Sequence, residues 1–205
     1  MSIHFHEGDL PAGALAGAKA LAVDCETMGL LPQRDRLCMV QLSAGDGDAH
    51  LVRFAPGAYD APHLKRLLGN ADVLKIFHFA RFDIAVLQHY LGLVAQPVYC
   101  TKIASRLVRT YTDRHGLKDV LKELLGVDIS KQQQSSDWGA ADISQAQRDY
   151  AAGDVLYLHA LKEALDAMLE REGRQALAAA CFAFLPARAA LDLAGWAETD
   201  IFAHV

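Results

Sequence analysis

The sequence lacks the features that mark several classes of protein. Only four of its 205 residues are cysteines and none form a C-x-x-C pair, so neither a structural zinc site nor a disulfide framework is expected. Fifteen glycines and six prolines are too few for a collagen-like or low-complexity chain. No uninterrupted apolar run approaches the roughly 18 residues of a membrane span, and the first ten residues do not resemble a signal peptide. We therefore expect a globular cytoplasmic protein with reduced thiols and no membrane contact.

The sequence also lacks excess positive charge. It has 20 Lys and Arg against 25 Asp and Glu, a formal net charge of −5, whereas domains that coat long nucleic acids are usually basic. A role in nucleic-acid chemistry would have to depend on local charge, metal ions or a short substrate. The best local phosphate-attracting segment is Lys102–Lys122, where six basic and two acidic residues give a formal +4. The alternative interpretation of this segment is a solvated helix face.

The pattern of apolar residues predicts a mixed α/β fold. Strands are expected over Lys19–Met28, Leu37–Ser43, Ala49–Phe54 and Val73–Phe77. Helices are expected over Phe79–Leu91, Leu117–Leu125 and Gln145 to about Glu172. The last helix would begin with a capping box formed by Ser144 and Gln147. We expect residues 1–205 to form one domain, a mixed sheet flanked by helices with a core at about residues 15–170 and a helical tail at about 174–205.

Two carboxylates at the end of the first predicted strand are the first candidates for chemistry. Side chains alternate along a strand, so Asp24 and Glu26 share one face and Cys25 lies on the other, buried face. Like charges side by side repel unless a cation separates them, and oxygen-only ligands suit Mg²⁺ or Mn²⁺. The structural alternative is a strand end that simply enters solvent.

Three further residues complete the candidate set. Asp83 is near the start of a predicted helix, where the helix dipole alone also favours an acid. Tyr150 and Asp154 are four residues apart and therefore share a helix face. An aspartate on a buried helix face needs a partner or a metal ion.

The order and spacing of these acids resemble the DEDD superfamily of 3′–5′ exonucleases, in the tyrosine-containing subclass. Asp83 follows Glu26 by 57 residues, and Tyr150 follows Asp83 by 67. Shorter motifs resemble the ribonuclease D-like branch: Arg36–Leu42, His78–Asp83, Gly116-Leu117 and Ser136–Trp138. The resemblance covers roughly residues 15–170 and implies a ribonuclease H-like mixed sheet flanked by helices.

From about residue 3 to its end, the chain is similar to the nanoRNase C group of short ribonuclease D-like enzymes. The motifs that carry this are Asp24–Leu30, Ile76–Asp83, Lys131–Trp138 and Ala189–Trp196. The resemblance implies a two-metal exonuclease, with Mg²⁺ or Mn²⁺, that cleaves short RNA, especially dinucleotides, to nucleoside 5′-monophosphates. It also implies a ring-like homo-oligomer and suggests an octamer. One departure is Cys100-Thr101, where relatives often carry Asp; the four acids are intact.

The resemblance also assigns roles to individual residues. Two ions held by the acids about 3.5–4 Å apart can clamp both oxygens of an in-line phosphoryl displacement, and Tyr150 would orient the attacking water. Leu30 would separate two bases, or else be a packed turn residue; His78 would touch a phosphate, or else bond a partner at a strand end. The polar loop Ile129–Trp138 is either a substrate-facing loop or solvated surface. The expected substrate-binding residues are Met28, Leu30, His78, Gln134, Ser136 and Trp138.

Alternative functions remain open at this point. A haloacid dehalogenase-type phosphatase needs D-x-D-x-T/V, but the second acid here is Glu26 and no suitable lysine motif accompanies it. A non-catalytic nucleic-acid-binding relative is disfavoured because all four acids and Tyr150 are present. The main rival is a broader ribonuclease D-like exonuclease acting on longer single-stranded RNA or DNA. The apolar tail Phe182–Trp196 either folds back on the core or meets another subunit.

Overall fold

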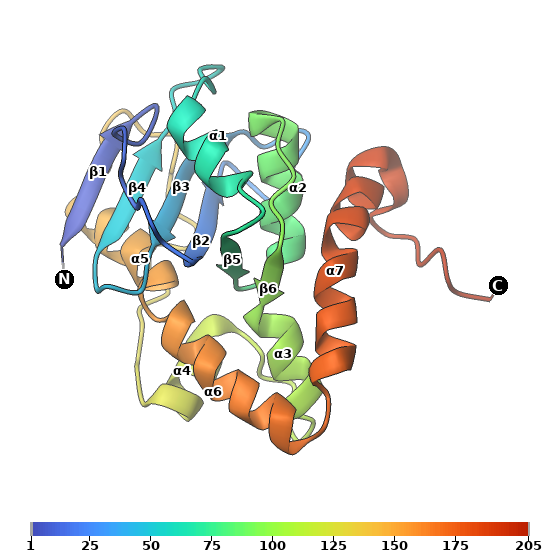
Figure 1. Ribbon diagram of the computed structural model, residues 1–205. Coiled ribbons are helices and arrows are strands. Elements are labelled where there is room, and N and C mark those ends of the chain that lie inside the picture. Colours follow the sequence, from blue (N-terminus) through green and yellow to red (C-terminus); the bar gives the residue numbers. More distant parts are fainter. Residues whose placement is uncertain (1, 205) are drawn as a thin grey trace.

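One mixed six-stranded sheet organises the protein in a computed structural model, which describes residues 2–204 (Figure 1). Its strand order is β1-β4-β3-β2-β5-β6. The strands are β1 (Ile3–Glu7), β2 (Ala20–Thr27), β3 (Leu37–Ser43), β4 (Ala49–Arg53), β5 (Leu74–Phe77) and β6 (Val98–Cys100). Strand β2 is antiparallel to β3 and parallel to β5, and it places Asp24 opposite Gln41 and Glu26 opposite Met39.

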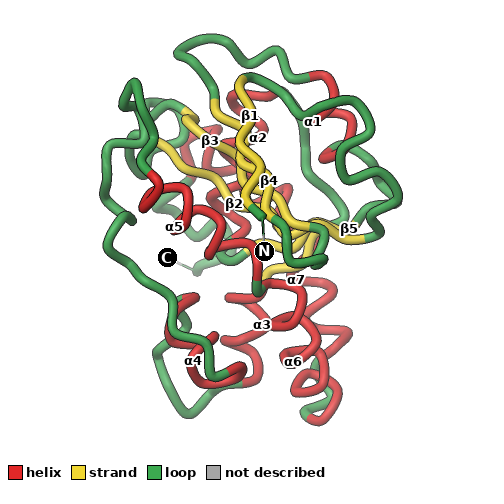
Figure 2. Tube along the Cα trace, turned by 90° about the vertical axis from the view of Figure 1, so that its left-hand side faces the viewer, coloured by secondary structure: helices red, strands yellow, loops and turns green. Residues whose placement is uncertain are grey.

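Helices cover both faces of this sheet. They are α1 (Pro62–Leu68), α2 (Ala80–Leu91), α3 (Thr101–Val108), α4 (Leu117–Leu125), α5 (Gln145–Leu156), α6 (Leu158–Arg171) and α7 (Gln175–Leu191). Helix α5 packs on β1 to β4, where Met39, Leu51, Trp138 and Ala151 belong to a small core. A larger core lies on the opposite face, toward α2. Figure 2 shows the long loop between α4 and α5 running up outside the sheet to the start of α5.

The structure confirms the expected fold class and the strands now labelled β2 to β5. It also confirms the capping box, in which the Ser144 side chain accepts from the Gln147 amide. The prediction of one helix from Gln145 to about Glu172 is wrong. The chain breaks at Tyr157 because α5 follows the sheet while α6 turns away to pack on α3 and α4.

Several elements were not predicted. Strands β1 and β6 and helices α1 and α3 are short, from three to eight residues, and therefore too short for a clear periodic signal. Strand β1 does alternate, with its histidines on one face, but it pairs only with the distant β4.

The C-terminal helix α7 lies beside α2 and β6 (Figure 1). Residues Gln175–Trp196 are long and apolar enough, by length and composition, to cross a membrane, which was not expected from the absence of a long uninterrupted apolar run. Within the most apolar 18-residue stretch of this segment, only 22% is buried inside the protein. Phe182 and Leu185 contribute to the core, so α7 uses one face for packing and leaves much apolar surface outside.

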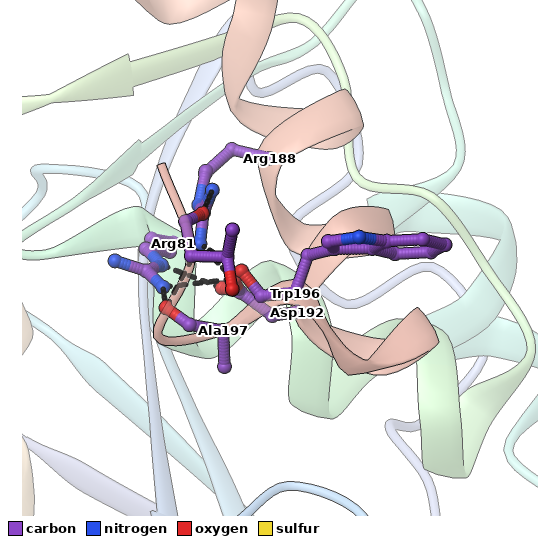
Figure 3. Close-up of polar contacts among 6 residues, drawn as sticks. Arg81, Arg188, Asp192, Trp196 and Ala197 are labelled. Atoms are coloured by element: carbon purple, nitrogen blue, oxygen red, sulfur yellow. Dashed lines mark hydrogen bonds and ion pairs between the residues drawn. The ribbon is translucent and has the colours of Figure 1, made fainter. Parts of the chain in front are cut away.

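A charged cluster attaches the turn after α7 to the start of α2, and we call it the C-terminal clamp (Arg81, Arg188 and Asp192; Figure 3). Both carboxylate oxygens of Asp192 accept from Arg81, at 2.5 and 2.8 Å, and one also accepts from Arg188 at 2.8 Å. The two guanidinium groups also donate to the carbonyl of Ala197. The turn reverses at Gly195, whose φ of 101° suits glycine.

Removing the negative charge of the clamp should loosen the tail. In Asp192→Asn two guanidinium groups face each other without a carboxylate, so we expect the free energy of unfolding to fall by about 1–3 kcal/mol. Thermal unfolding at fixed protein concentration measures this as a melting temperature several degrees lower. Asp142→Asn is the matched control, since Asp142 is exposed and forms no ion pair with the described residues. Equal melting temperatures for both variants would contradict the clamp.

Candidate active site

The end of β2 supplies the first two acids of the site. Asp24 and Glu26 are partly buried and face α5, whereas Cys25 points into the opposite core with 7% exposure, as alternation predicts. Gln41 of β3 is fully buried on the same face, and its Nε2 donates to Glu26 Oε1 at 3.3 Å. Gln41 thus orients Glu26. Sequence reasoning missed this role, although Gln41 is the only amide side chain in the mainly apolar strand β3.

Helices on both sides of the sheet complete the set. Asp154 comes from α5, and its carboxylate gathers with those of Asp24 and Glu26, one oxygen of each lying within 4.8 Å of the others. Asp83 lies outside this triad. It reaches the site from α2 on the other face, is only 3% exposed, and contacts Cys25. The structure therefore brings all four predicted acids to one strand end, three together and the fourth behind them.

The proton affinity of these acids is strongly raised. Burial raises the pKa of Asp24 to about 7. Burial and the charge of Asp24 raise the pKa values of Glu26, Asp83 and Asp154 well above their usual range. Carboxylates crowded in this way need protons or cations between them. An oxygen-only donor set fits Mg²⁺ or Mn²⁺, so these residues suit the divalent ions that the motifs predict.

Tyr150 lies one helical turn before Asp154, on the same face of α5. Burial, and next the charges of Asp154 and Glu26, raise its pKa, so the phenol keeps its proton at neutral pH. Behind it stands Trp138, with ring centroids 6.0 Å apart. Trp138 is only 2% exposed and therefore supports the tyrosine ring while offering little surface of its own to a ligand.

The acids form the floor of a cleft of about 580 Å³. One wall is the loop after β2, where Met28 is 49% and Leu30 is 82% exposed. Asp35 fixes this loop by accepting from the Leu31 amide at 2.9 Å, and it lies so close to Gly29 that any larger residue there would clash. Leu30 therefore projects into solvent from a hydrogen-bonded loop and is not packed in a turn.

Another part of the cleft lining is polar. Gln134 and Ser136 both line the cleft; Gln134 is exposed, and Ser136 Oγ accepts from Gln147 Nε2 at 3.2 Å. The capping-box glutamine of α5 therefore also positions the predicted substrate-facing loop. Ser136 and Gln134 keep free hydrogen-bonding capacity toward the cleft, and their substrate-binding role stays a prediction.

His78 also lines the cleft, with its Nδ1 2.8 Å from Thr101 Oγ1. Burial, and next the charge of Lys102, lower the pKa of His78 to about 3, so at neutral pH the ring is uncharged. The predicted phosphate contact would then be a hydrogen bond without ionic attraction.

The structure places the basic residues of the predicted segment Lys102–Lys122 in different surroundings. Arg109 is fully buried and paired with Glu123 at 2.5 Å, so it is structural. Lys122 pairs with Asp128 outside the cleft. Among the described residues three lysines line the cleft: Lys102, Lys118 and Lys131.

Cys100, the departure from the family pattern, is buried where α2 and α3 begin. Burial raises the pKa of its thiol, while the backbone amides of Ile103 and Ala80 partly offset this by hydrogen bonding. Cys100 is therefore a buried core residue and is not among the residues that line the cleft.

The chain is similar in sequence to known exonucleases. A family model described as 3′–5′ exonuclease matches residues 12–170. Ribonuclease D from Granulibacter bethesdensis is 36% identical over 156 residues, which are 76% of this chain and 39% of that protein. The chain spans about two fifths of the length of the curated ribonuclease D relatives it matches.

Two solved structures are similar over their whole length. Brucella melitensis NrnC bound to pGG has a TM-score of 0.97 and 58% sequence identity, covering 100% of both chains. Brucella melitensis NrnC with bound Mg²⁺ has a TM-score of 0.96 and 57% identity, again covering 100% of both chains. The similarity therefore extends through α7, which the family model does not match.

Removing one crowded carboxylate should stabilise the metal-free protein. The pKa of Asp24 is about 7 when folded and near 4 when unfolded, so the folded state binds the proton more tightly. Stability is then lost as pH rises from about 4 to 7. In EDTA at pH 8 we expect Asp24→Asn to raise the free energy of unfolding by at least about 1 kcal/mol. The melting temperature of this variant should therefore be higher than that of wild type.

Saturating Mg²⁺ should reverse this order, because the ion stabilises only the protein with the complete site. Differential scanning calorimetry with and without Mg²⁺ measures both effects, with Asp142→Asn as control. A metal-free Asp24→Asn protein less stable than wild type would show that the carboxylates are not crowded as described.

Proposed function

Because the chain belongs to the 3′–5′ exonuclease family, we propose that it is a metal-dependent 3′–5′ exoribonuclease of short RNA. Its main substrates would be dinucleotides, cleaved to nucleoside 5′-monophosphates. The observation that carries this is the full-length similarity to NrnC bound to pGG, a dinucleotide with a 5′-phosphate. The gathering of four acids and Tyr150 at one cleft supports the same conclusion.

The residues divide the chemical work. Asp24, Glu26, Asp83 and Asp154 would hold up to two divalent ions, Mg²⁺ or Mn²⁺. When bound, such ions activate water and stabilise the charge that develops on the phosphate and the leaving 3′-oxygen. Tyr150 would orient the attacking water through a hydrogen bond from its hydroxyl, and a role as base would need help from the metal ions, because burial and the neighbouring carboxylates raise the pKa of the phenol.

The cleft walls suit a short substrate. Exposed Leu30 and Met28 offer apolar contacts to bases, and Gln134 and Ser136 offer hydrogen bonds. Only three lysines line the cleft in a chain of net charge −5, so few phosphates can be neutralised. Binding would therefore depend on the ends and bases of the substrate more than on a long backbone.

The rival function is a broader exonuclease that degrades longer single-stranded RNA or DNA. The sequence similarity to ribonuclease D favours this rival, because those relatives share the catalytic core. They are, however, longer proteins, and the similarity covers only 39% of the first of them. We give preference to short RNA because the NrnC similarity covers this chain from end to end.

We further propose a cytoplasmic homo-oligomer, for which the resemblance suggests an octamer. All four cysteines are free thiols, which fits a reducing compartment. Trp196, Ile201 and Phe202 are 45–74% exposed on the tail, and burying them against a second copy is favourable by about 25 cal/mol per Å². A closed ring would narrow access to the clefts and so favour short substrates.

Substrate length provides the decisive test. With Mg²⁺ and equal subsaturating concentrations, a 5′-phosphorylated RNA dinucleotide should be cleaved faster than a 5′-phosphorylated 7-mer. EDTA and Asp154→Ala should abolish both activities. Tyr150→Phe should lower kcat by about 100-fold with a small change in KM, since a transition-state hydrogen bond is lost. Comparable rates on both lengths would favour the broader exonuclease, and full activity in EDTA would refute the metal site.

Assembly is tested by light scattering at micromolar concentration. We expect a mass several times the 22.3 kDa of one chain. Phe202→Asp, which places a charge on the most exposed aromatic residue of the tail, should yield smaller species. Tyr111→Asp is the control, because Tyr111 is similarly exposed and its hydroxyl donates to Glu123 of α4, not to a residue of the tail. A wild-type mass of 22.3 kDa would refute the oligomer.

A further inference from the structure

Phe79 has an unusual backbone conformation at the edge of the cleft. It joins β5 to α2 with φ 72° and ψ 45°, in the left-handed region that favours glycine. A bulky residue is a genuine outlier there. The Phe79 side chain makes no capping hydrogen bond, so it does nothing for the helix start that a glycine could not do. Strained residues of this kind cluster at functional sites and need a reason to persist.

The Phe79 ring is also unusually open. It is 45% exposed, whereas Trp138 is 2% exposed and the other aromatic residues lining the cleft, Phe82 and Tyr150, are partly buried. Phe79 is therefore the aromatic side chain that offers the most ring surface to a ligand in this cleft. It lies four residues before Asp83, one helical turn from an acid of the metal site.

One face of the ring is already in use. The ammonium group of Lys102, at the start of α3, lies 4.3 Å from the centroid of the Phe79 ring. A cation at this distance is attracted to the ring and restrains its orientation. The charge of Lys102 also stands at the cleft wall, where it can approach a phosphate. The remaining exposed ring surface is free for a flat partner.

We propose that Phe79 is a stacking platform for one nucleobase of the substrate, held by Lys102 from behind. The proposal rests on the proposed function, because a base next to the scissile phosphate must lie near Asp83. Stacking uses the face of a base and not its hydrogen-bonding edge, so the platform accepts all four bases. It also requires an unpaired, unstacked base, which a short single strand presents freely. Phe79 would therefore favour unpaired, single-stranded substrates without distinguishing one base from another.

The test compares wild type, Phe79→Gly, Phe79→Tyr and Tyr111→Ala. Glycine removes the ring and relieves the backbone, so this variant is expected to fold, which its melting temperature checks. Substrates are 5′-phosphorylated dinucleotides carrying 2-aminopurine at either position, whose fluorescence is quenched by stacking. Quenching is read by rapid mixing before turnover, and kcat and KM are measured in Mg²⁺.

We expect quenching at one of the two positions in wild type and its loss in Phe79→Gly. The kcat/KM of Phe79→Gly should fall by about 5- to 150-fold, the range for losing one base–aromatic stack, with most of the change in KM. Phe79→Tyr should restore both readouts, and Tyr111→Ala should match wild type. A dinucleotide with an abasic residue at the quenched position should lose the same factor in wild type and nothing further in Phe79→Gly.

Unchanged quenching and kcat/KM in Phe79→Gly would overturn the proposal. So would a fall confined to kcat with quenching retained, because Phe79 would then act only by shaping the start of α2. Wild-type quenching without cleavage of any dinucleotide would refute the proposed function and still support the platform.

Discussion

Mutual repulsion among four buried or partly buried carboxylates is the constraint on which this structure depends. Each acid has its pKa raised by burial and, for three of them, by the charge of Asp24. Flexible segments would move apart to relieve that repulsion. The chain instead mounts Asp24 and Glu26 on the central strand of the sheet and brings helices to it from both faces. The two apolar cores hold these helices in place. Their packing offsets the repulsion among the carboxylates, and the crowded carboxylates attract cations.

The first turn of α2, with the residue before it, carries three side chains that contact different parts of the structure. Phe79 faces the cleft, Arg81 enters the C-terminal clamp, and Asp83 reaches the acids. The tail is therefore joined by hydrogen bonds to the segment that carries both Phe79 and Asp83. Gln33, in the loop that carries Leu30, donates to the carbonyl of Leu193 in the same C-terminal turn. The tail thus bonds to both chain segments that carry the apolar cleft residues, although it lies beyond the residues that the family model matches.

Local periodicity explains which parts of the site the sequence could predict. The two-residue spacing of Asp24 and Glu26 and the four-residue spacing of Tyr150 and Asp154 fix shared faces once the element type is known. Asp83 needed the family resemblance, because an acid in a first helical turn is ordinary. Phe79 could not be found this way, since its importance comes from a positive φ and an exposed ring, which are properties of the folded chain.

Charge counting failed for a related reason. The segment Lys102–Lys122 sums to +4, yet Arg109 is neutralised in the interior and Lys122 pairs with Asp128 outside the cleft. Lys118 lines the cleft but also pairs with Asp128. Composition cannot distinguish a cation that faces a ligand from one that closes a structural pair. Likewise, the break at Tyr157 was hidden because both α5 and α6 keep a helical pattern, and only the surfaces they pack on require a change of direction.

The balance of forces in the cleft connects its chemistry to substrate size. Ionic attraction from three lysines grows with every added phosphate but is screened by salt and opposed by the net charge of −5. Ring and side-chain contacts from Phe79 and Leu30, in contrast, would be satisfied by the bases beside the scissile bond and would gain nothing from a longer strand. A cleft that binds mainly through such contacts reaches its full affinity with two nucleotides. Each added nucleotide would then bring charge into an acidic protein with few further partners.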